Sequence, residues 1–332
     1  MRIAVLGAGR IGRIHANNLR ALADVSIACI CDPITSQAEA LAQQTDAPVG
    51  SVDQVFADPT IDAVVIASST DTHSELLLKA AEARKHVFCE KPIDLSLVRA
   101  EQCRDAIQRS GITCMLGFQR RFDPTFFSAK TRIEAGEIGT PEVLIITSRD
   151  PGAPPVSYLK GSGGIFRDML IHDFDICRWI LDDEIVSVHA TASCLTDPSI
   201  AQEAGDFDTT AVTLRSRQGR LCQINTSRRA AYGYDQRFEV LGDRGMIQCG
   251  NHRPTEVVHW GSQHISIDLP EHFFLERYRD AYRLEMQHFL SVLKEGGSPR
   301  TSIEDGVAAQ RLADAATESA RTGQVVQLAE QG

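Results

Sequence analysis

A carboxylate, an imidazole and a second carboxylate are closely spaced near the middle of this chain of 332 residues. Asp168, His172 and Asp175 follow one another at intervals of four and three residues, which predicts that they share one face of a helix. A carboxylate that orients an imidazole makes a general base for removing a proton from an alcohol. A solvated surface pair and a metal site are the alternatives. No cysteine or further carboxylate is placed to complete a metal site, so we expect no metal.

A lysine follows a short apolar run earlier in the chain. Residues 86–89 predict a strand, and Glu90, Lys91 and Pro92 come directly after it. Ligands of open α/β sheets bind beyond the carboxyl ends of the strands, where we expect Lys91. Its ammonium group can donate to a substrate oxygen and stabilise charge that develops there. A surface lysine in a turn before Pro92 is the alternative.

Three glycines near the N-terminus have the spacing of a dinucleotide site. Gly7, Gly9 and Gly12 follow the apolar run 2–6 and open a helical pattern. Gly7 permits a tight turn, Gly9 lets the backbone approach a pyrophosphate, and Gly12 lets the helix pack closely. The first N–H groups of the helix, together with Arg10, would meet the phosphates. The motif predicts dinucleotide binding, and a glycine turn used only for packing is the alternative.

An aspartate selects between the two common dinucleotides. Asp32 ends the second predicted strand, 20 residues after Gly12. A carboxylate at this place accepts hydrogen bonds from the ribose hydroxyls and repels a 2′-phosphate, and no arginine follows it directly. Asp32 therefore favours NAD over NADP, unless it is merely a solvated residue at the start of a turn.

Elements that position these residues alternate between strand and helix in the first part of the chain. Strands are expected at 2–6, 25–31, 63–67, 86–89 and 113–116. Helical patterns lie between them, up to about residue 22 and at 35–44, 53–57, 72–83 and 96–109. Thr72 and Glu75 predict a capping box at the start of one of these helices. The order predicts an open parallel sheet with right-handed crossovers.

The pattern changes after about residue 121. A helix at 124–135 and a strand at 142–148 precede a loop at 150–164 and a helix at 168–181. Strand-like runs then follow one another, before two closing helices, at 185–194, 209–214, 221–226, 237–241 and 246–249, then 278–294 and 303–320. Consecutive strands predict a largely antiparallel sheet. We expect two domains, 1–121 and 122–332.

Composition excludes several classes of protein. Hydrophobic residues make up 43% and charged residues 23%, which excludes a disordered chain. The net charge of −10 argues against nucleic acid or an anionic membrane as the main partner. The nine cysteines, an odd number without a C-x-x-C pair, predict buried thiols in a reducing compartment. Without a signal peptide or a membrane span, a cytoplasmic protein is expected.

Together these motifs resemble the Gfo/Idh/MocA oxidoreductase family over nearly the whole chain. The matching stretches are GAGRIG, CDP, EKP and GGIFRDMLIHDFD, supported by residues 117–123, 232–235, 277–282 and 305–309. The resemblance implies an α/β protein, with an N-terminal Rossmann domain that binds NAD and a C-terminal α/β domain with a large, mostly antiparallel open sheet. This sheet is usually an oligomer interface in the family, so a homodimer or homotetramer is implied.

Roles for individual residues follow from the same resemblance, which is strongest to the inositol dehydrogenase branch. His172 is the implied general base, Asp168 orients it, and Lys91 holds the reacting oxygen. The implied substrate contacts are Lys91, Arg121, Asp168, His172, Asp175, Tyr234 and Tyr282. The implied cofactor contacts are Gly7, Gly9, Arg10, Ile11, Gly12, Asp32, Ser68, Ser69, His73, Glu90, Lys91 and Arg120.

The implied reaction is the NAD-dependent oxidation of a ring hydroxyl of a cyclic polyol. We expect myo-inositol to be oxidised to its 2-keto form, scyllo-inosose. Scyllo-inositol or a pyranose sugar of the glucose type is the alternative substrate. Two other classes on the same fold are a non-catalytic, NAD-sensing regulator and a hydrolase that uses bound NAD for a transient oxidation. Retention of a lysine, an aspartate and a histidine in the implied catalytic positions argues against the regulator.

Overall fold

The computed structural model describes residues 1–328, and the chain forms two compact units. The first contains Met1–Phe122 and Asp280–Gln310, and the second contains Asp123–Arg279 and residues 311–328. The predicted division between residues 121 and 122 did not include the return of 280–310 to the first unit. The end of the predicted second domain, residues 329–332, lies outside the described residues.

The first unit is built on a parallel sheet with the strand order β2-β1-β3-β4-β5. Its strands are β1 (Arg2–Leu6), β2 (Ser26–Cys31), β3 (Ala63–Ile66), β4 (His86–Cys89) and β5 (Cys114–Leu116). The chain runs from β1 out to β2 and then crosses back past β1 to β3. Open α/β sheets bind their ligands at the carboxyl ends of the strands beside such a reversal.

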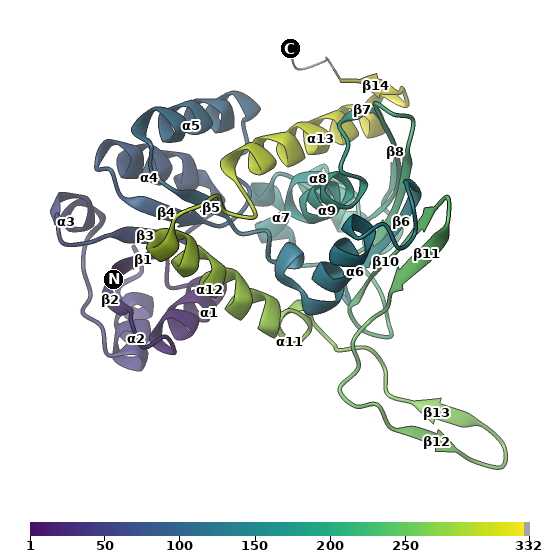
Figure 1. Ribbon diagram of the computed structural model, residues 1–332, viewed down its shortest axis with the longest axis horizontal. Helices are drawn as coiled ribbons and strands as arrows, with labels where there is room; N and C mark the ends of the chain where they lie inside the picture. The colour runs from purple at the N-terminus through teal and green to yellow at the C-terminus, as the bar shows by residue number, and fades with distance from the viewer. Residues whose placement is uncertain (329–332) are drawn as a thin grey trace. The chain divides into compact units, whose positions relative to one another are not determined.

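Helices lie on both faces of this sheet (Figure 1). They are α1 (Arg10–Arg20), α2 (Thr35–Thr45), α3 (Val52–Ala57), α4 (Thr70–Glu82), α5 (Leu97–Ser110) and α12 (Arg279–Glu295). In Figure 1, α4 and α5 cover one face, and α1, α2 and α12 cover the other. Every residue of β3 is buried, as expected for a strand that is covered on both faces. The predicted parallel sheet is confirmed.

The predicted capping box in this unit is wrong. Helix α4 begins at Thr70, and Ser69 is its N-cap, so Thr72 lies inside the first turn. The Thr72 hydroxyl donates to the Ser69 carbonyl oxygen at 2.8 Å instead of capping an N–H group. The helix starts early because Ser69 already has the extended backbone of an N-cap.

The second unit is built on a sheet with the order β11-β10-β6-β9-β8-β7-β14. Its strands are β6 (Pro141–Arg149), β7 (Ile185–Ser193), β8 (Thr209–Ser216), β9 (Leu221–Ser227), β10 (Asp235–Gly242), β11 (Gly245–Cys249) and β14 (Val326–Gln327). Only β6 and β9 pair in parallel within this described sheet, and the other neighbours are antiparallel. The predicted large, mostly antiparallel sheet is confirmed.

One face of this sheet is covered and the other is exposed. Strand β8 alternates between buried and exposed residues along its whole length, which is the period of a half-covered strand. Helices α6 (Pro124–Glu134), α9 (Ile171–Leu181) and α13 (Ile303–Thr322) lie on the covered side (Figure 1). The Ser319 hydroxyl of α13 accepts from the Ala190 N–H of β7 at 2.9 Å.

Two predicted elements before β7 differ from the structure. The predicted loop 150–164 contains α7 (Val156–Ser162), which begins after Pro155, a residue suited to a helix start. The predicted helix 168–181 is two helices, α8 (Ile165–Asp168) and α9. Met169 and Leu170 form a turn between them, and the Leu170 N–H donates to the Ile165 carbonyl oxygen, five residues back.

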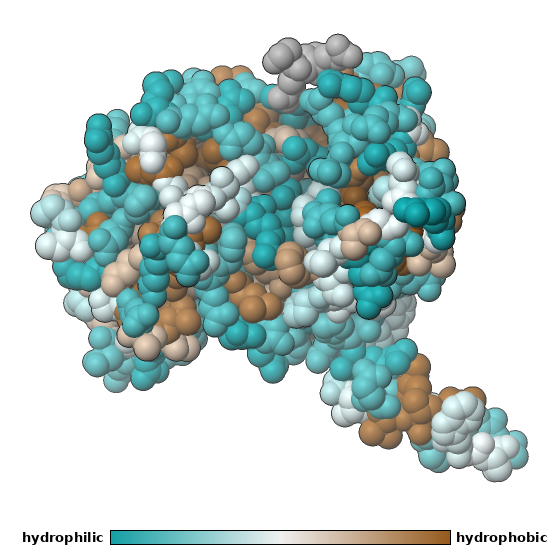
Figure 2. Space-filling view, in the orientation of Figure 1, coloured by the Kyte–Doolittle hydropathy of each residue, from teal (hydrophilic) through white to brown (hydrophobic). Residues whose placement is uncertain are grey.

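Five short elements after β7 were not predicted, namely α10 (Pro198–Ala204), α11 (Phe274–Arg277), β12 (Val258–Trp260), β13 (Ile265–Ile267) and β14. Strands β12 and β13 form a separate hairpin. The hairpin and the residues that flank it expose large apolar side chains, and Figure 2 shows hydrophobic surface in this part of the molecule. The exposed residues are Val257, Val258, Trp260, Ile265, Ile267 and Leu269. Trp260 alone is 75% exposed.

All nine cysteines are free thiols, and eight of them are buried, as the composition predicted. Burial raises the pKa of Cys103 to about 11, so this thiol stays protonated at neutral pH. Within residues 1–328, no group of three His, Cys, Asp or Glu side chains is placed to hold a metal ion. None of the described helices is long and apolar enough to cross a membrane.

Candidate active site

The turn after β1 accepts only glycine at two positions. Gly7 has a φ of +111°, and a Cβ there would lie 2.4 Å from the Ala67 carbonyl oxygen. A Cβ on Gly12 would lie 2.0 Å from the Gly7 carbonyl oxygen. These glycines let α1 start directly against the carboxyl ends of β1 and β3.

Gly9 lies in the same turn, but unlike Gly7 and Gly12 it has open space beside its Cα. It is the N-cap of α1, and a Cβ added to it would meet no atom of the chain within 4 Å. The open space therefore suits a group from outside the chain that approaches the backbone closely. The first N–H groups of a helix lack partners within it, so those of Arg10, Ile11 and Gly12 fit a pyrophosphate.

Asp32 is fixed at the end of β2 by two backbone groups. Its Oδ2 accepts from the Ala8 N–H at 2.7 Å, and its Oδ1 accepts from the Ile34 N–H at 2.8 Å. These bonds tie the carboxylate to the glycine turn. Each carboxylate oxygen can accept more than one hydrogen bond, so capacity remains for ribose hydroxyls. The position fits the predicted selection of NAD.

The segment after β3 is held by a histidine. His73 is 1% exposed, with Nδ1 2.7 Å from the Pro92 carbonyl oxygen and Nε2 3.2 Å from the Ser68 carbonyl oxygen. Burial lowers the pKa of His73, and the neutral ring donates to one of these oxygens at a time. The ring is buried, so we expect it to contribute to cofactor binding indirectly, because it joins the loop at Ser68 to the loop at Pro92. Ser69 starts α4 beside it.

The residue before Lys91 faces inward. Glu90 is buried, and its Oε1 lies 2.7 Å from Nε2 of His15 in α1. Its carboxylate is therefore bonded inside the unit, and its contact with the cofactor stays a prediction. Lys91 follows at the carboxyl end of β4, as predicted.

Three further predicted residues of the first unit are buried: Arg120, Arg121 and Tyr282. The Arg121 guanidinium donates to the Arg300 carbonyl oxygen and to Oδ1 of Asp305, each at 2.9 Å. Arg121 lies in a 3₁₀ helix, η1 (Gln119–Phe122), and therefore fastens the start of α13 to this helix. The Tyr282 ring on α12 lies with its centre 5.8 Å from that of His15.

In the second unit, Asp168 is held by two side chains. The Tyr158 hydroxyl donates to Oδ1 at 2.9 Å, and Nη2 of Arg228 lies 3.4 Å from Oδ2. His172 and Asp175 follow on α9, and both are buried. The predicted single helical face is wrong, because the turn at 169–170 separates Asp168 from α9. The three residues share one segment, but not one helix.

Sequence reasoning missed Tyr158 and Arg228. Tyr158 lies in a stretch predicted to be a loop, and Arg228 follows Asp168 by 60 residues. Arg228 is 1% exposed, and its N–H donates to the Asp208 carbonyl oxygen at 2.8 Å. No local pattern marks either residue, since both meet Asp168 only through the fold.

Asp208 organises the loop that supports Arg228. Its carboxylate accepts from the N–H groups of Leu195 and Thr196, each at 2.8 Å, and from the hydroxyls of Thr196 and Thr209, at 2.6 and 2.8 Å. Burial acts to raise the pKa of Asp208, but these hydrogen bonds outweigh it and hold the pKa well below its ordinary value. Asp208 is therefore a fixed negative charge.

Asp173 and Tyr234 are two further polar residues in the interior of this unit. Asp173 on α9 accepts from the Gln236 amide at 3.1 Å, so it faces the sheet and not the side of Asp168. Tyr234 is buried, and its ring centre lies 5.9 Å from that of Tyr278. Tyr234 is the only predicted site residue of this unit outside residues 168–175.

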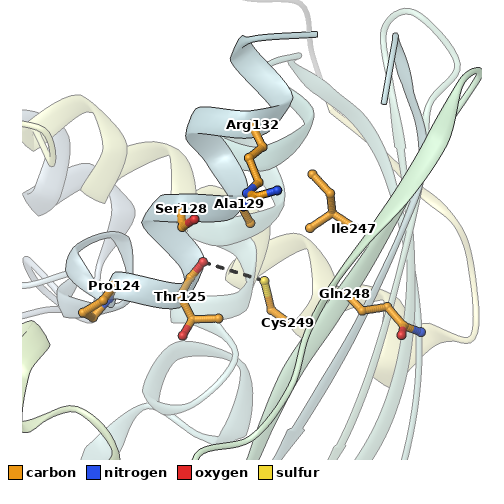
Figure 3. Close-up of a pocket in the computed structure, with 8 residues that line it drawn as sticks. All are labelled: Pro124, Thr125, Ser128, Ala129, Arg132, Ile247, Gln248 and Cys249. Carbon is orange, nitrogen blue, oxygen red and sulfur yellow. Dashed lines mark hydrogen bonds between the residues drawn. The ribbon is translucent and has the colours of Figure 1, made fainter. Parts of the chain in front are cut away.

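A surface hollow of about 530 Å³ lies between α6 and β11 (Figure 3). It is lined by Pro124, Thr125, Ser128, Ala129, Arg132, Ile247, Gln248 and Cys249. The Cys249 thiol points to the Thr125 carbonyl oxygen across it, at 3.9 Å. None of the predicted site residues lines this hollow, so it does not mark the predicted chemistry.

The predicted residues thus divide between the units. The glycine turn, Asp32 and Lys91 belong to the first unit, while Asp168 and His172 belong to the second. The family's NAD-binding Rossmann domain matches residues 1–118, and its C-terminal alpha/beta domain matches residues 130–328. This chain belongs to the Gfo/Idh/MocA oxidoreductase family.

Relatives within the Gfo/Idh/MocA family cover the whole chain. The myo-inositol 2-dehydrogenase of Thermotoga maritima is 44% identical over 332 residues, 99% of each chain. The crystal structure of a myo-inositol dehydrogenase from Corynebacterium glutamicum is 43% identical and matches with a TM-score of 0.95 over 100% of this chain and 99% of that one. A scyllo-inositol dehydrogenase from Lactobacillus casei, with bound NAD(H) and scyllo-inositol, is 28% identical and matches with a TM-score of 0.91 over 98% of each chain.

The first unit is accordingly an NAD-binding Rossmann domain, and the chain is an NAD-dependent oxidoreductase. The resemblance stated from the motifs, the α/β fold and the cofactor are confirmed by these matches. The glycine turn and Asp32 are the features of the first unit that fit NAD.

Proposed function

We propose that this protein oxidises myo-inositol at one ring hydroxyl to the 2-keto form, with NAD⁺ as the oxidant. The observation that carries the proposal is the buried His172, four residues after Asp168, an aspartate that Tyr158 and Arg228 hold in place. A base held in this way suits an alcohol, which must lose its hydroxyl proton as it is oxidised. The names of the relatives support a cyclic polyol as the alcohol.

Each residue has a distinct proposed role. His172 takes the hydroxyl proton, Asp168 orients the imidazole, and Lys91 holds the reacting oxygen and stabilises charge on it. Bound NAD⁺ supplies the hydride acceptor. Asp175 and Tyr234 supply polar contacts to the other hydroxyls. The first unit holds the cofactor through Gly9 to Gly12, Asp32 and the segment that begins with Ser68.

The test is the formation of NADH with a panel of substrates, followed by its absorbance. Purified protein would be assayed with NAD⁺ and myo-, scyllo- and chiro-inositol and both enantiomers of glucose. The highest kcat/KM is expected with myo-inositol, and with NAD⁺ over NADP⁺. Activity confined to scyllo-inositol would support the alternative that the Lactobacillus casei relative suggests. A protein that binds NAD⁺ but never accumulates NADH would overturn the dehydrogenase proposal.

We also propose that the protein is a cytoplasmic homodimer or homotetramer that assembles through the second unit. The sheet leaves one face uncovered, with Leu221 and Leu241 among the exposed residues, and the β12–β13 hairpin exposes Trp260. Exposed apolar surface of this kind marks interaction sites. Light scattering after size exclusion would test the assembly, and a monomer at micromolar concentration would contradict it. The buried free thiols suit a reducing compartment.

A further inference from the structure

Three titratable side chains are enclosed together in the interior of the first unit. His15 of α1 and Glu285 of α12 are 0% exposed, and Glu90 at the end of β4 is buried beside them. Nε2 of His15 lies 2.7 Å from Oε1 of Glu90. The rings of Phe88 and Tyr282 lie against His15, with centres 4.7 and 5.8 Å away. The surroundings of this cluster are therefore largely apolar.

The two carboxyl groups of the cluster have unequal surroundings. Glu90 is bonded to His15, whereas both oxygens of Glu285 lack a hydrogen-bond partner among residues 1–328. Burial first, and then the negative charge of Glu90, raise the pKa of Glu285 well above its ordinary value. Along α12, the titratable side chains one turn before and one turn after Glu285 are Tyr282 and His288.

Glu90 is packed tightly against the backbone at Gly117, and it directly precedes Lys91 in the chain. A Cβ on Gly117 would lie 2.8 Å from Oε2 of Glu90, so the carboxylate rests directly on the backbone there. The Gly117 N–H donates to the Cys89 carbonyl oxygen at 2.8 Å. A displacement of the Glu90 carboxylate would therefore also displace the backbone next to Lys91.

We propose that Glu285 is a positioning residue for Lys91. As an uncharged acid, Glu285 leaves the negative charge of the cluster on Glu90 alone. An ionised Glu285 would repel the Glu90 carboxylate from His15 and disturb the turn. The inference deepens the proposed function and rests on the role of Lys91 in it. The proposal requires that Glu285 keeps its proton at neutral pH in the folded protein.

The first test measures stability as a function of pH. E285Q replaces the acid with a neutral group of the same shape, and unfolding by denaturant would be followed from about pH 5 to 9. If Glu285 keeps its proton only when folded, wild type loses stability relative to E285Q as pH rises. The ratio of their unfolding constants is expected to increase about tenfold per pH unit.

E295Q is the matched control, because Glu295 is exposed at the end of the same helix. The ratio of the unfolding constants of wild type and E295Q is expected to stay constant with pH. A constant ratio for E285Q as well, or a stability of E285Q that falls relative to wild type as pH rises, would overturn the proposal. If E285Q does not fold, wild type labelled with ¹³C-glutamate decides: an infrared band of a protonated glutamate at about pH 8 supports it, and no such band overturns it.

The second test separates positioning from simple packing by the pH profile of kcat. Wild type is expected to lose kcat at alkaline pH as Glu285 ionises, and E285Q to keep kcat at least tenfold higher there. The limb at acidic pH is expected to be the same in both, because Glu285 is uncharged there in wild type as well. Identical alkaline limbs would overturn the positioning role. If wild type oxidises no substrate, the proposed function fails, while the stability test still decides the state of Glu285.

Discussion

The two units hold their parts of the proposed site by different means. In the first, the backbone does most of the holding: a glycine turn, the start of a helix, and an aspartate bonded to two N–H groups. In the second, side chains hold side chains, since Tyr158 and Arg228 fix Asp168. A site formed by backbone groups is disrupted when a substitution adds atoms to it. A site held by side chains is disrupted when a substitution removes one of the partners. Substitutions can therefore test the two halves separately.

The largest effect is expected from His172→Ala. Loss of the general base is expected to lower kcat by about 10²- to 10⁴-fold, because such groups contribute that much to proton transfer. The dissociation constant of NAD⁺, measured by fluorescence titration, is expected to stay within about twofold, because the first unit holds the cofactor. His189→Ala is the control, since His189 is exposed on β7. Near-wild-type turnover of the His172 variant would refute its role.

Asp208→Asn tests the loop beneath Arg228. The amide cannot accept all the hydrogen bonds that Asp208 receives, so the free energy of unfolding is expected to fall by about 3 kcal/mol at neutral pH. Because the pKa of Asp208 is lowered by folding, its contribution is present above the ordinary carboxyl pKa and lost as pH falls below it. The difference from wild type should therefore narrow below about pH 4.

Asp182→Asn serves as the control for that measurement. Asp182 is exposed and has a φ of +49°, a backbone conformation that asparagine also accepts. Its stability is expected to stay within about 0.5 kcal/mol of wild type. A gap between Asp208→Asn and wild type that widened in acid would contradict the assignment of Asp208 as a fixed negative charge.

Two glycine variants compare positions within the backbone half. Gly9→Ala adds a methyl group where the chain leaves open space, so we expect normal stability and an NAD⁺ affinity lowered by about 10- to 100-fold. Gly12→Ala places its methyl group 2.0 Å from a backbone oxygen, so stability is expected to fall as well. Thermal unfolding and NAD⁺ titration check both variants. An unchanged NAD⁺ affinity in Gly9→Ala would contradict the binding of the pyrophosphate at this turn.

The smallest effect is expected from Tyr158→Phe. One hydrogen bond to Asp168 is lost while Arg228 remains, so kcat is expected to fall by about 2- to 10-fold. Steady-state kinetics would also show an almost unchanged KM, because Tyr158 holds the carboxylate and not the substrate. A larger KM with an unchanged kcat would mean that Tyr158 binds substrate directly.

The same contrast explains what could be predicted from the sequence. The glycine motif and Asp32 are local signals, and the structure places both where the spacing predicted. The break at Met169 and Leu170 could not be predicted from periodicity, because both residues are apolar and suit a continuous helix. The pairing of Arg228 with Asp168, and of α12 with the first unit, depend on contacts between segments far apart in the chain. Such contacts leave no periodic pattern.

The return of residues 280–310 to the first unit bears on how the protein is synthesised. When residue 122 leaves the ribosome, the inner side of α1 still lacks α12, and the ring of Phe88 lacks Phe289, whose centre lies 5.8 Å away in the finished unit. At 5–20 residues per second, the intervening segment takes about 10–30 seconds to make. During that interval the nascent Rossmann domain is incomplete and exposes an apolar surface. Fragments meant to bind NAD alone should therefore include residues 280–310 through an engineered link.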